Sequence, residues 1–252
     1  MRKQLISFLI SLLLSYTSQA QVGQSEGVVS YRRTTYWPKV YARMTYLSQE
    51  QKDRAANTWK NDSDFKEKMT LVFSPVASLY SHESETGESE DGRWTWRNKE
   101  LFLYRNFEQE KQTDVEEMLG KTYVVADSLK LPVWRIGNEI REIAGHLCTN
   151  ATTTDPIKNQ TIMAWFAQDI PVPAGPERYC GLPGLILELD INQGDVVIEA
   201  TALVFKPVAD TLKPHAVKKA KTISTEAYDT LLKTYIADQI KAQQNPYWEI
   251  RY

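Results

Sequence analysis

The sequence contains few of the residues on which metal centres and nucleophilic sites depend. It has two cysteines and three histidines among 252 residues. It has neither the Gly-x-Ser-x-Gly segment of a serine hydrolase nor the His-Glu-x-x-His segment of a zinc peptidase. Carboxylates are plentiful, but no spacing indicates the catalytic pair of a glycosidase. We therefore predict a protein with no enzymatic activity and no cofactor.

Long apolar runs and strongly one-sided charge are also lacking. After residue 20 no segment approaches the ~20 apolar residues that a membrane helix needs. No cysteine follows the leader to carry a lipid anchor. The net charge is −2 at pH 7, and the basic residues form no stripe that could neutralise phosphates. We expect no membrane span, lipid anchor or nucleic-acid partner in the mature chain, and the sequence leaves its oligomeric state open.

The first twenty residues have the pattern of a secretory signal peptide. Arg2 and Lys3 precede an apolar run from Leu5 to Tyr16, and Ser18-Gln19-Ala20 forms a small-x-small cleavage site. We expect cleavage after residue 20 and export to the periplasm or the extracellular space. Residues 21–252 contain no linker or internal repeat, so we expect one domain.

The stretch from Pro171 to Phe205 has the densest structural signals. Pro183 and Gly184 predict a type II turn over residues 182–185, with positive φ at Gly184. Alternating apolar residues then predict strands over 185–191 and 196–205. Asn192-Gln193-Gly194-Asp195 between them predicts a chain reversal, so this stretch is a predicted hairpin.

Similar patterns elsewhere predict a mainly β fold. Alternation predicts further strands over residues 26–37, 66–74, 78–82, 101–106, 111–118, 121–126, 138–154 and 161–166. Ser48 and Ser224 are predicted caps of a short helix in the N-terminal half and of a C-terminal helix. The apolar residues 246–252 are expected to dock. We predict a single curved antiparallel sheet or half-open β-barrel with these two helices.

A hexapeptide in the predicted turn resembles the signature of a known family. Gly181, Leu182, Pro183, Gly184, Leu185 and Ile186 spell the motif of the GLPGLI family of exported bacterial proteins. The resemblance extends over residues 134–205 and includes Trp134, Ile136, Gly145-His146-Leu147-Cys148, Ala151, Ala164-Trp165-Phe166, Ile170-Pro171 and Gly175-Pro176. The family has no settled activity, so the resemblance implies a compartment and a kinship rather than a reaction.

The two cysteines have two competing interpretations. In an exported protein, Cys148 and Cys180 are expected to form a disulfide, worth ~3–4 kcal/mol in the chain-entropy model. Alternatively, His146 and Cys148, two residues apart in a predicted strand, could bind copper or zinc with Cys180 and Met163. A disulfide consumes both thiolates, so the two interpretations exclude each other, and the disulfide is the one we predict.

Other patterns have ordinary structural explanations beside functional ones. The acidic run 83–91 lacks the ligand spacing of a calcium loop, so we expect a solvated hairpin loop there. His82 and His215 are expected in loops. A carbohydrate or lipid platform would use aromatic rings, and so would a β-sheet core. The rings in question are Trp94, Trp96, Trp134, Trp165 and Tyr179.

The leader and the resemblance together favour a non-enzymatic accessory protein of the cell envelope. Such a protein would bind a protein partner or an apolar ligand on the open face of its sheet. Membership of the GLPGLI family is often linked with outer-membrane TonB-dependent transport, which implies a transport protein as one partner. The alternatives are a soft-metal protein that uses His146, Cys148 and Cys180, and a hydrolase.

Overall fold

A computed structural model describes residues 25–60, 64–89 and 91–252, so the predicted signal peptide lies outside the described residues. The helices are α2 (Trp37–Arg43), α3 (Gln49–Thr58), α4 (Thr225–Lys241) and the short η2 (Pro246–Trp248). The strands are β1 (Gly27–Thr35), β2 (Phe65–Phe73), β3 (Ala77–His82), β4 (Thr86–Glu88), β5 (Thr95–Arg97), β6 (Leu101–Asn106), β7 (Lys111–Met118), β8 (Lys121–Ser128), β9 (Arg135–Ile143), β10 (His146–Asp155), β11 (Gln160–Ala167), β12 (Leu185–Ile191), β13 (Val196–Phe205) and β14 (Lys221–Ile223).

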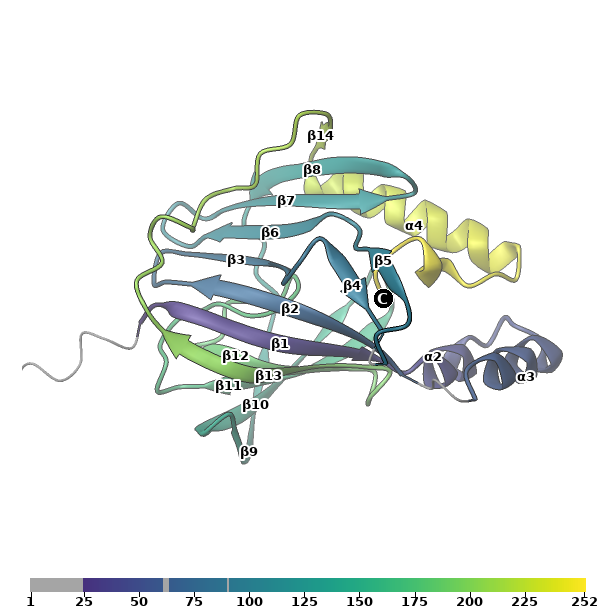
Figure 1. The fold of residues 1–252 in the computed structure, drawn as a ribbon, viewed down its shortest axis with the longest axis horizontal. Helices are drawn as coiled ribbons and strands as arrows, with labels where there is room; N and C mark the ends of the chain where they lie inside the picture. Colours follow the sequence, from purple (N-terminus) through teal and green to yellow (C-terminus); the bar gives the residue numbers. More distant parts are fainter. Residues whose placement is uncertain (1–24, 61–63, 90) are drawn as a thin grey trace, which may run out of the picture.

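Twelve strands form one large curved sheet (Figure 1). Their order is β14-β8-β7-β6-β3-β2-β1-β13-β12-β11-β10-β9, and β4 and β5 form a separate hairpin. Only β14 and β8 are parallel among the described pairs of strands. The sheet stays open, with β14 and β9 at its two edges. The predicted mainly β fold is confirmed, and its form is an open curved sheet rather than a closed barrel.

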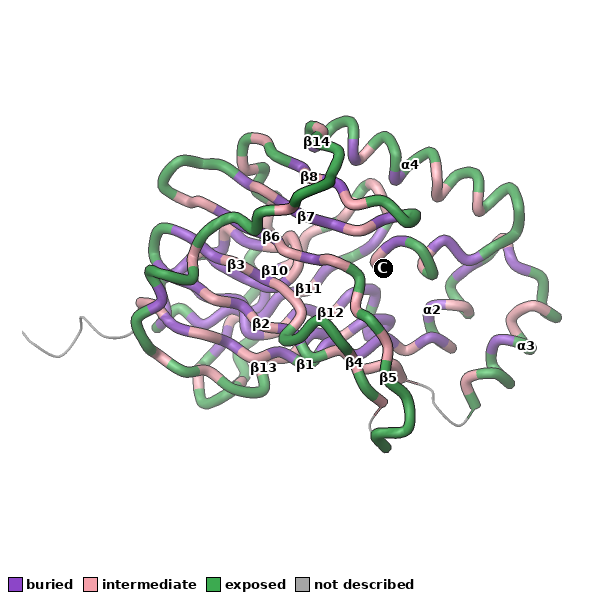
Figure 2. Tube along the Cα trace, turned by 45° about the horizontal axis from the view of Figure 1, so that its top comes forward, coloured by how far each residue is buried: buried purple, intermediate pink, exposed green. Residues whose placement is uncertain are grey.

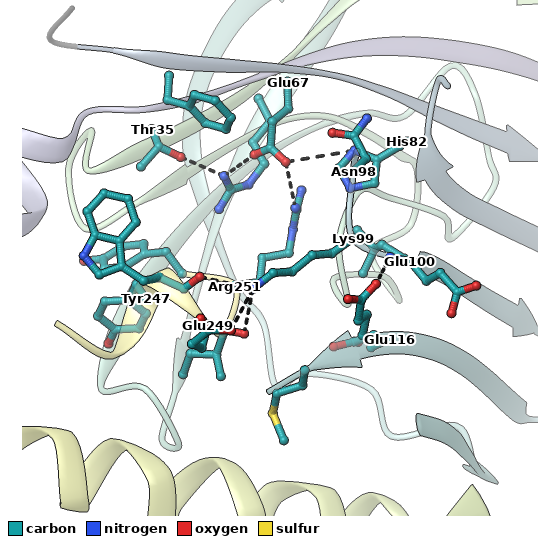
Figure 3. A pocket seen from close by; sticks show the side chains of 18 of the residues that line it. Thr35, Glu67, His82, Asn98, Lys99, Glu100, Glu116, Tyr247, Glu249 and Arg251 are labelled. Carbon is teal, nitrogen blue, oxygen red and sulfur yellow. Dashed lines mark hydrogen bonds and ion pairs between the residues drawn. The ribbon is translucent and has the colours of Figure 1, made fainter. Parts of the chain in front are cut away.

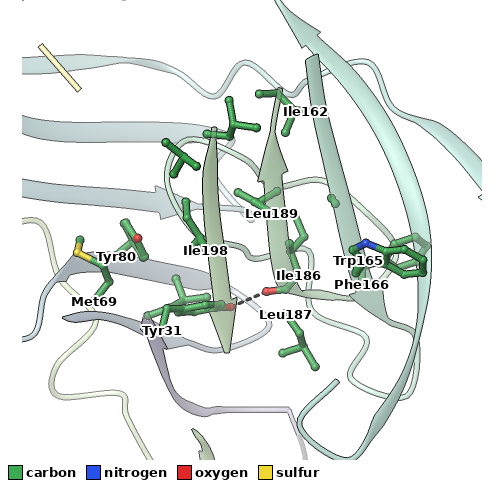
Figure 4. Packing of buried hydrophobic residues seen from close by; sticks show 14 of the residues in the cluster. Tyr31, Met69, Tyr80, Ile162, Trp165, Phe166, Ile186, Leu187, Leu189 and Ile198 are labelled. Carbon is green, nitrogen blue, oxygen red and sulfur yellow. Dashed lines mark hydrogen bonds between the residues drawn. The ribbon is translucent and has the colours of Figure 1, made fainter. Parts of the chain in front are cut away.

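Alternation along the strands gives the sheet one buried face. In β1, Val29, Tyr31 and Arg33 are at most 4% exposed, whereas Arg32 between them is exposed. Successive side chains of a strand point to opposite faces, so these three share the inner side. Figure 4 shows Tyr31 packed in the same core as Met69 of β2 and residues of β12. Each fully buried large apolar side chain contributes about 1.5–3 kcal/mol to folding.

Both predicted helices are present, and a third was not predicted. Ser48 and Gln51 form a reciprocal capping box at the start of α3. Ser224 caps α4, whose Tyr228 and Leu232 pack beside β8. The strand predicted over residues 26–37 stops at Thr35, and Pro38 lies in the first turn of α2, where proline needs no N–H partner. None of the helices in the described ranges is long and apolar enough to cross a membrane.

The predicted strand over residues 138–154 is wrong, because it is a hairpin of two strands. Ala144 and Gly145 have φ of 50° and 84°, and they turn the chain between β9 and β10. The usual turn residues Pro, Asn and Asp are absent between residues 139 and 149, so nothing except Gly145 interrupts the predicted strand. Gly145, which adopts positive φ at little cost, was the available signal.

The hairpin of β12 and β13 is confirmed, but the turn before it differs from the prediction. Positive φ falls on Gly181, at 90°, and Gly184 is not among the residues with positive φ. Gly184 is needed for a different reason. A Cβ at this position would lie 2.2 Å from the carbonyl oxygen of Ala167, so only glycine lets the turn approach β11 this closely.

We predict that Gly184→Ala lowers the free energy of unfolding by about 3 kcal/mol, the upper end of overpacking penalties, because the clashing atom belongs to the backbone of β11. Gly92→Ala is the control. Its methyl group meets open space, so only the strain of positive φ remains, ~1–2 kcal/mol. Urea unfolding of both variants checks this. Equal losses in the two variants would show that the close approach is unimportant.

Candidate functional site

A pocket of about 340 Å³ lies where the buried face of the sheet meets segment 246–252. Strands β1, β2, β6 and β7, the residues from Trp96 to Leu101 and segment 246–252 all contribute to its walls. Figure 3 shows Glu67, His82, Lys99, Glu116 and Arg251 among the side chains that line the pocket. Figure 2 shows that the β4–β5 hairpin beside it is mostly exposed. The pocket therefore joins a buried polar interior to solvent.

Four side chains beside the pocket form a closed ring of alternating charge, which we call the charge ring. Arg33 and Arg251 donate to the two oxygens of Glu67 at 2.7 and 3.1 Å. Arg251 also donates to both oxygens of Glu177 at 2.7 Å. Arg33 Nε lies 3.3 Å from Glu177 Oε1 and closes the ring. The four side chains are 5–19% exposed, so the ring holds together β1, β2, the loop before β12 and segment 246–252.

Burial and charge shift the pKa values in and beside the charge ring. Burial alone would raise the pKa of Glu67, but the charges of Arg251 and Arg33 outweigh it and lower the pKa to about 2. The pKa of Glu177 is also lowered, because Arg251 outweighs the effect of burial. Burial, with a contribution from Arg251, lowers the pKa of His82 to about 4. At neutral pH the two carboxylates are therefore ionised and His82 is uncharged.

A second charge cluster, made of Arg105, Asp114, Glu116 and Arg178, lies farther along the same face. Arg105 pairs with Asp114, and Arg178 pairs with Glu116. Arg178 Nη1 also lies 3.6 Å from Asp114. Tyr228 of α4 donates a 2.6 Å hydrogen bond to Glu116. This second charge cluster therefore fixes α4 to β7 through a buried carboxylate.

One loop supplies a residue to each of the two charge clusters. Glu177 belongs to the charge ring, and the next residue, Arg178, belongs to the second charge cluster. Glu177 has φ of 56°, a left-handed conformation that costs a non-glycine residue of order 1–3 kcal/mol. This conformation lets consecutive side chains diverge. The loop itself is tied down by a bond from Gly181 N to Pro173 O at 2.8 Å.

Aromatic rings form another part of the pocket wall. Trp37, Trp59 and Trp248 stack mutually, with centroids 4.6–6.0 Å apart and interplanar angles of 21–25°. Trp96 packs on Phe65 at 5.3 Å. Trp248 is 48% exposed and Trp96 is half-buried, so both present ring surface to the pocket.

The predicted disulfide is not formed. Cys148 and Cys180 are both buried free thiols in different surroundings. Cys148 lies on β10, opposite Ala167, and its Sγ is 3.6 Å from the carbonyl oxygen of His146. Burial raises the pKa of Cys148 to about 11 and also raises that of Cys180, so both stay protonated at neutral pH. The compartment argument did not consider where the fold places the two residues.

The structure does not assemble the alternative soft-metal site either. His146 Nδ1 lies 2.7 Å from Asp169, and Met163 lies on β11 opposite Thr152. Across residues 25–60, 64–89 and 91–252, no three His, Cys, Asp or Glu side chains are grouped so that they could hold a metal ion. The interpretation of His146, Cys148, Cys180 and Met163 as ligands is therefore not supported by their positions.

The other aromatic residues and histidines that were named from the sequence lie in different parts of the structure. Trp96 lines the pocket, whereas Trp94 points into solvent at 73% exposure. Trp165 lies under Arg141, with the guanidinium 4.2 Å from its ring centroid. The expectation of loop positions was wrong for His82, which ends β3 and lines the pocket. The other rings have structural contacts: Trp134 packs on Tyr179, and His215 stacks on Phe102.

Sequence reasoning missed both charge clusters. The available signal was charge at strand positions where alternation places the buried face. In β1, Arg33 lies two residues after Tyr31 and so falls on the buried face. In β2, Glu67 lies two residues before Met69 and falls on the buried face for the same reason. Nothing in the sequence indicates that the partner of Glu67 is 184 residues away, at Arg251.

We predict that Glu177→Gln lowers the free energy of unfolding by about 3–5 kcal/mol, because it leaves Arg33 and Arg251 buried with one carboxylate between them. Glu50→Gln is the matched control. Its partner Arg54 is exposed, so little change is expected. Chemical denaturation of both variants compares them. A Glu177→Gln variant as stable as the control would show that the ring does not contribute to folding.

We also predict that the free energy of unfolding falls as the pH drops from about 6.5 to about 4. In this range His82 is protonated in the unfolded chain but stays neutral in the folded protein, because its pKa is lowered to about 4. The lowered pKa of Glu67 extends the loss from about 4.5 to about 2. His82→Asn should flatten the upper part of this profile only. Urea unfolding at a series of pH values measures it, and an unchanged upper slope in the variant would refute the assignment to His82.

Comparisons with known proteins relate the signature region to a family model. The model, described as a protein of unknown function (Porph_ging), matches residues 157–188. This stretch contains β11, the loop with Glu177 and Arg178, and the hexapeptide at 181–186. A search of curated proteins finds no match.

Two solved structures of PNGF-II, in different crystal forms, resemble the fold. They superpose with TM-scores of 0.56 and 0.55 at 13% sequence identity. In both cases the match covers 82% of this chain and 33% of the PNGF-II chain. The chain thus matches a third of the length of PNGF-II, and at this identity the likeness concerns the fold alone.

Proposed function

We propose that this is a non-enzymatic binding protein whose pocket holds an uncharged ligand with an apolar ring face and hydroxyl groups, as in a saccharide. The observation that carries the proposal is the composition of the pocket. Ring surfaces of Trp96 and Trp248 line it together with His82, whose Nδ1 lies 4.0 Å from Glu67 Oε1 and has no hydrogen-bond partner among the described residues. A buried polar atom without a partner is costly, and a ligand hydroxyl would satisfy it.

The charges around the pocket favour an uncharged ligand. The Arg33 and Arg251 guanidinium groups are engaged by Glu67 and Glu177. At the rim, Arg97 pairs with Glu117, and Lys99 pairs with Glu249. A charged ligand would have to compete with these internal ion pairs. The C–H face of a sugar ring, by contrast, packs on an exposed indole without disturbing them.

The ionisable side chains of the pocket are poorly suited to act as a general acid or base. A general acid or base works best with a pKa near the operating pH. The pKa values of Glu67 and His82 are about 2 and about 4, and the pKa of Glu116 is lowered mainly because Arg178 and Tyr228 outweigh its burial. Carboxylates do come together at the pocket, which the sequence did not indicate. Their lowered pKa values keep them ionised, so they cannot donate a proton near neutral pH. This supports binding over hydrolysis.

The location and partner of the protein are part of the proposal. The leader at residues 1–20 supports export to the periplasm or beyond, where an accessory protein would meet saccharides of the envelope. The resemblance to the GLPGLI family supports an association with an outer-membrane transport protein. Such a partner would receive the ligand held in the pocket.

We predict that the wild-type protein binds at least one member of a panel of neutral oligosaccharides, and that Trp96→Ala weakens the binding about tenfold or more, as expected for loss of one stacking ring. Trp94→Ala is the matched control, since Trp94 is two residues away but points into solvent. Isothermal titration calorimetry measures both. No binding by any saccharide, or equal losses in the two variants, would contradict the proposal.

A further inference from the structure

Strand β9 is a long edge of the sheet, and no strand of the described residues pairs with its outer side. It has nine residues, whereas β14 at the opposite edge has three. Eight of its nine residues are exposed. Figure 1 shows β9 and β10 extending away from the rest of the sheet. An edge of this kind presents unpaired N–H and C=O groups to other chains.

Large apolar side chains gather near the same edge. Of the twelve large hydrophobic residues that are exposed in the described chain, five fall between residues 131 and 147. Ile140 and Leu147 are each 68% exposed. The register of β9 and β10 places Ile140 opposite Thr149 and Leu147 opposite Glu142, so Ile140 and Leu147 share a face. Exposed apolar surface concentrated in this way marks an interaction site.

The backbone of β9 shows which groups are available. Regular pairing with β10 covers Ile140 to Ile143, and the register shifts just before it. At the shift Glu139 N donates to the side-chain Oδ1 of Asn150 at 3.1 Å, so the N–H of Glu139 points inward. Neighbouring residues of a strand direct their polar groups to opposite sides. The N–H and C=O of Ile140 therefore point outward, away from β10. A second strand could form a pair of hydrogen bonds with Ile140.

Symmetry restricts how β9 can pair with a copy of itself. A two-fold axis between antiparallel edge strands is perpendicular to the sheet and keeps every side chain on its own face. The axis must then pass through a residue that faces its own copy. With the axis at Ile140, Glu139 of each copy faces Arg141 of the other. No like charges are opposed, and Glu139 meets Arg141 when that side chain leaves its contacts with Trp165 and Glu188.

Other positions of the axis bring like charges together or pair fewer residues. Axes at Glu139 and Arg141 oppose each of these residues to its own copy, and an axis at Asn138 opposes Arg135 to Arg141. An axis at Gly137 avoids like charges but pairs only residues 135–139 of the strand. Like charges directly opposite each other destabilise a strand pair. Charge and the number of paired residues together favour the axis at Ile140.

We propose that two copies of this chain pair through β9, antiparallel about Ile140, so that the sheet continues from one subunit into the next. In this register the charges of Glu139 and Arg141 are both matched. The surface is separate from the pocket, so the dimer does not depend on the proposed ligand.

Charge reversal tests the pairing. Wild-type protein is expected to be a dimer in sedimentation equilibrium. Glu139→Arg opposes Arg to Arg141 twice, and Arg141→Glu opposes Glu to Glu139 twice, so each variant should dissociate about tenfold or more readily. An equimolar mixture of the two variants restores both attractive contacts and should form a heterodimer. Recovery of the dimer on mixing is the result expected for opposite charges facing each other across this edge, as they do with the axis at Ile140.

Glu142→Arg is the control, because the same charge change then faces uncharged Asn138 and should leave the dimer intact. Circular dichroism checks the fold, since Arg141 also pairs with Glu188. If Arg141→Glu does not fold, the comparison of Glu139→Arg with Glu142→Arg decides. A wild-type monomer at all concentrations, or a dimer indifferent to Glu139→Arg, would overturn the proposal.

Discussion

The pocket depends on the charge ring of Arg33, Glu67, Glu177 and Arg251. Buried ions are tolerated only when each has partners, and removing one leaves another unpaired in a poorly solvated site. None of the four side chains can therefore move alone. Because Arg251 is one of them, segment 246–252 is fixed against β1 and β2. This places Trp248, three residues earlier, in the pocket wall and in the stack with Trp37.

The loop before β12 explains why proline and glycine are concentrated there. The loop lies against the buried face of the sheet. Its backbone comes very close to that of the neighbouring strand, as at Gly184 beside β11, and glycine allows this approach because it has no Cβ. Its two consecutive charged residues, Glu177 and Arg178, satisfy two different clusters of buried charge. The loop thereby links segment 246–252 to α4. The residues that follow hold the loop in place through the bond from Gly181 N to Pro173 O and the close approach of Gly184 to β11.

Much of the fold could be predicted from the sequence, because strands and helix caps are local patterns. The β12–β13 hairpin, the caps Ser48 and Ser224 and the mainly β class all follow from spacing. The turn at Ala144 and Gly145 was missed because no Pro, Asn or Asp marks it in the sequence. The candidate site was missed for another reason: its charges meet across the sheet, and local pattern cannot pair Glu67 with Arg251. The disulfide prediction failed because it used compartment alone.

Hydrogen exchange of segment 246–252 tests the central claim most directly, because exchange reports local opening. If the charge ring holds the segment as firmly as a strand, the amides of residues 247–252 that are bonded inside the protein should exchange within about tenfold of those of β2. Exchange of the segment as fast as that of the exposed residues of α3 would contradict the account, since the segment would then open without unfolding the sheet.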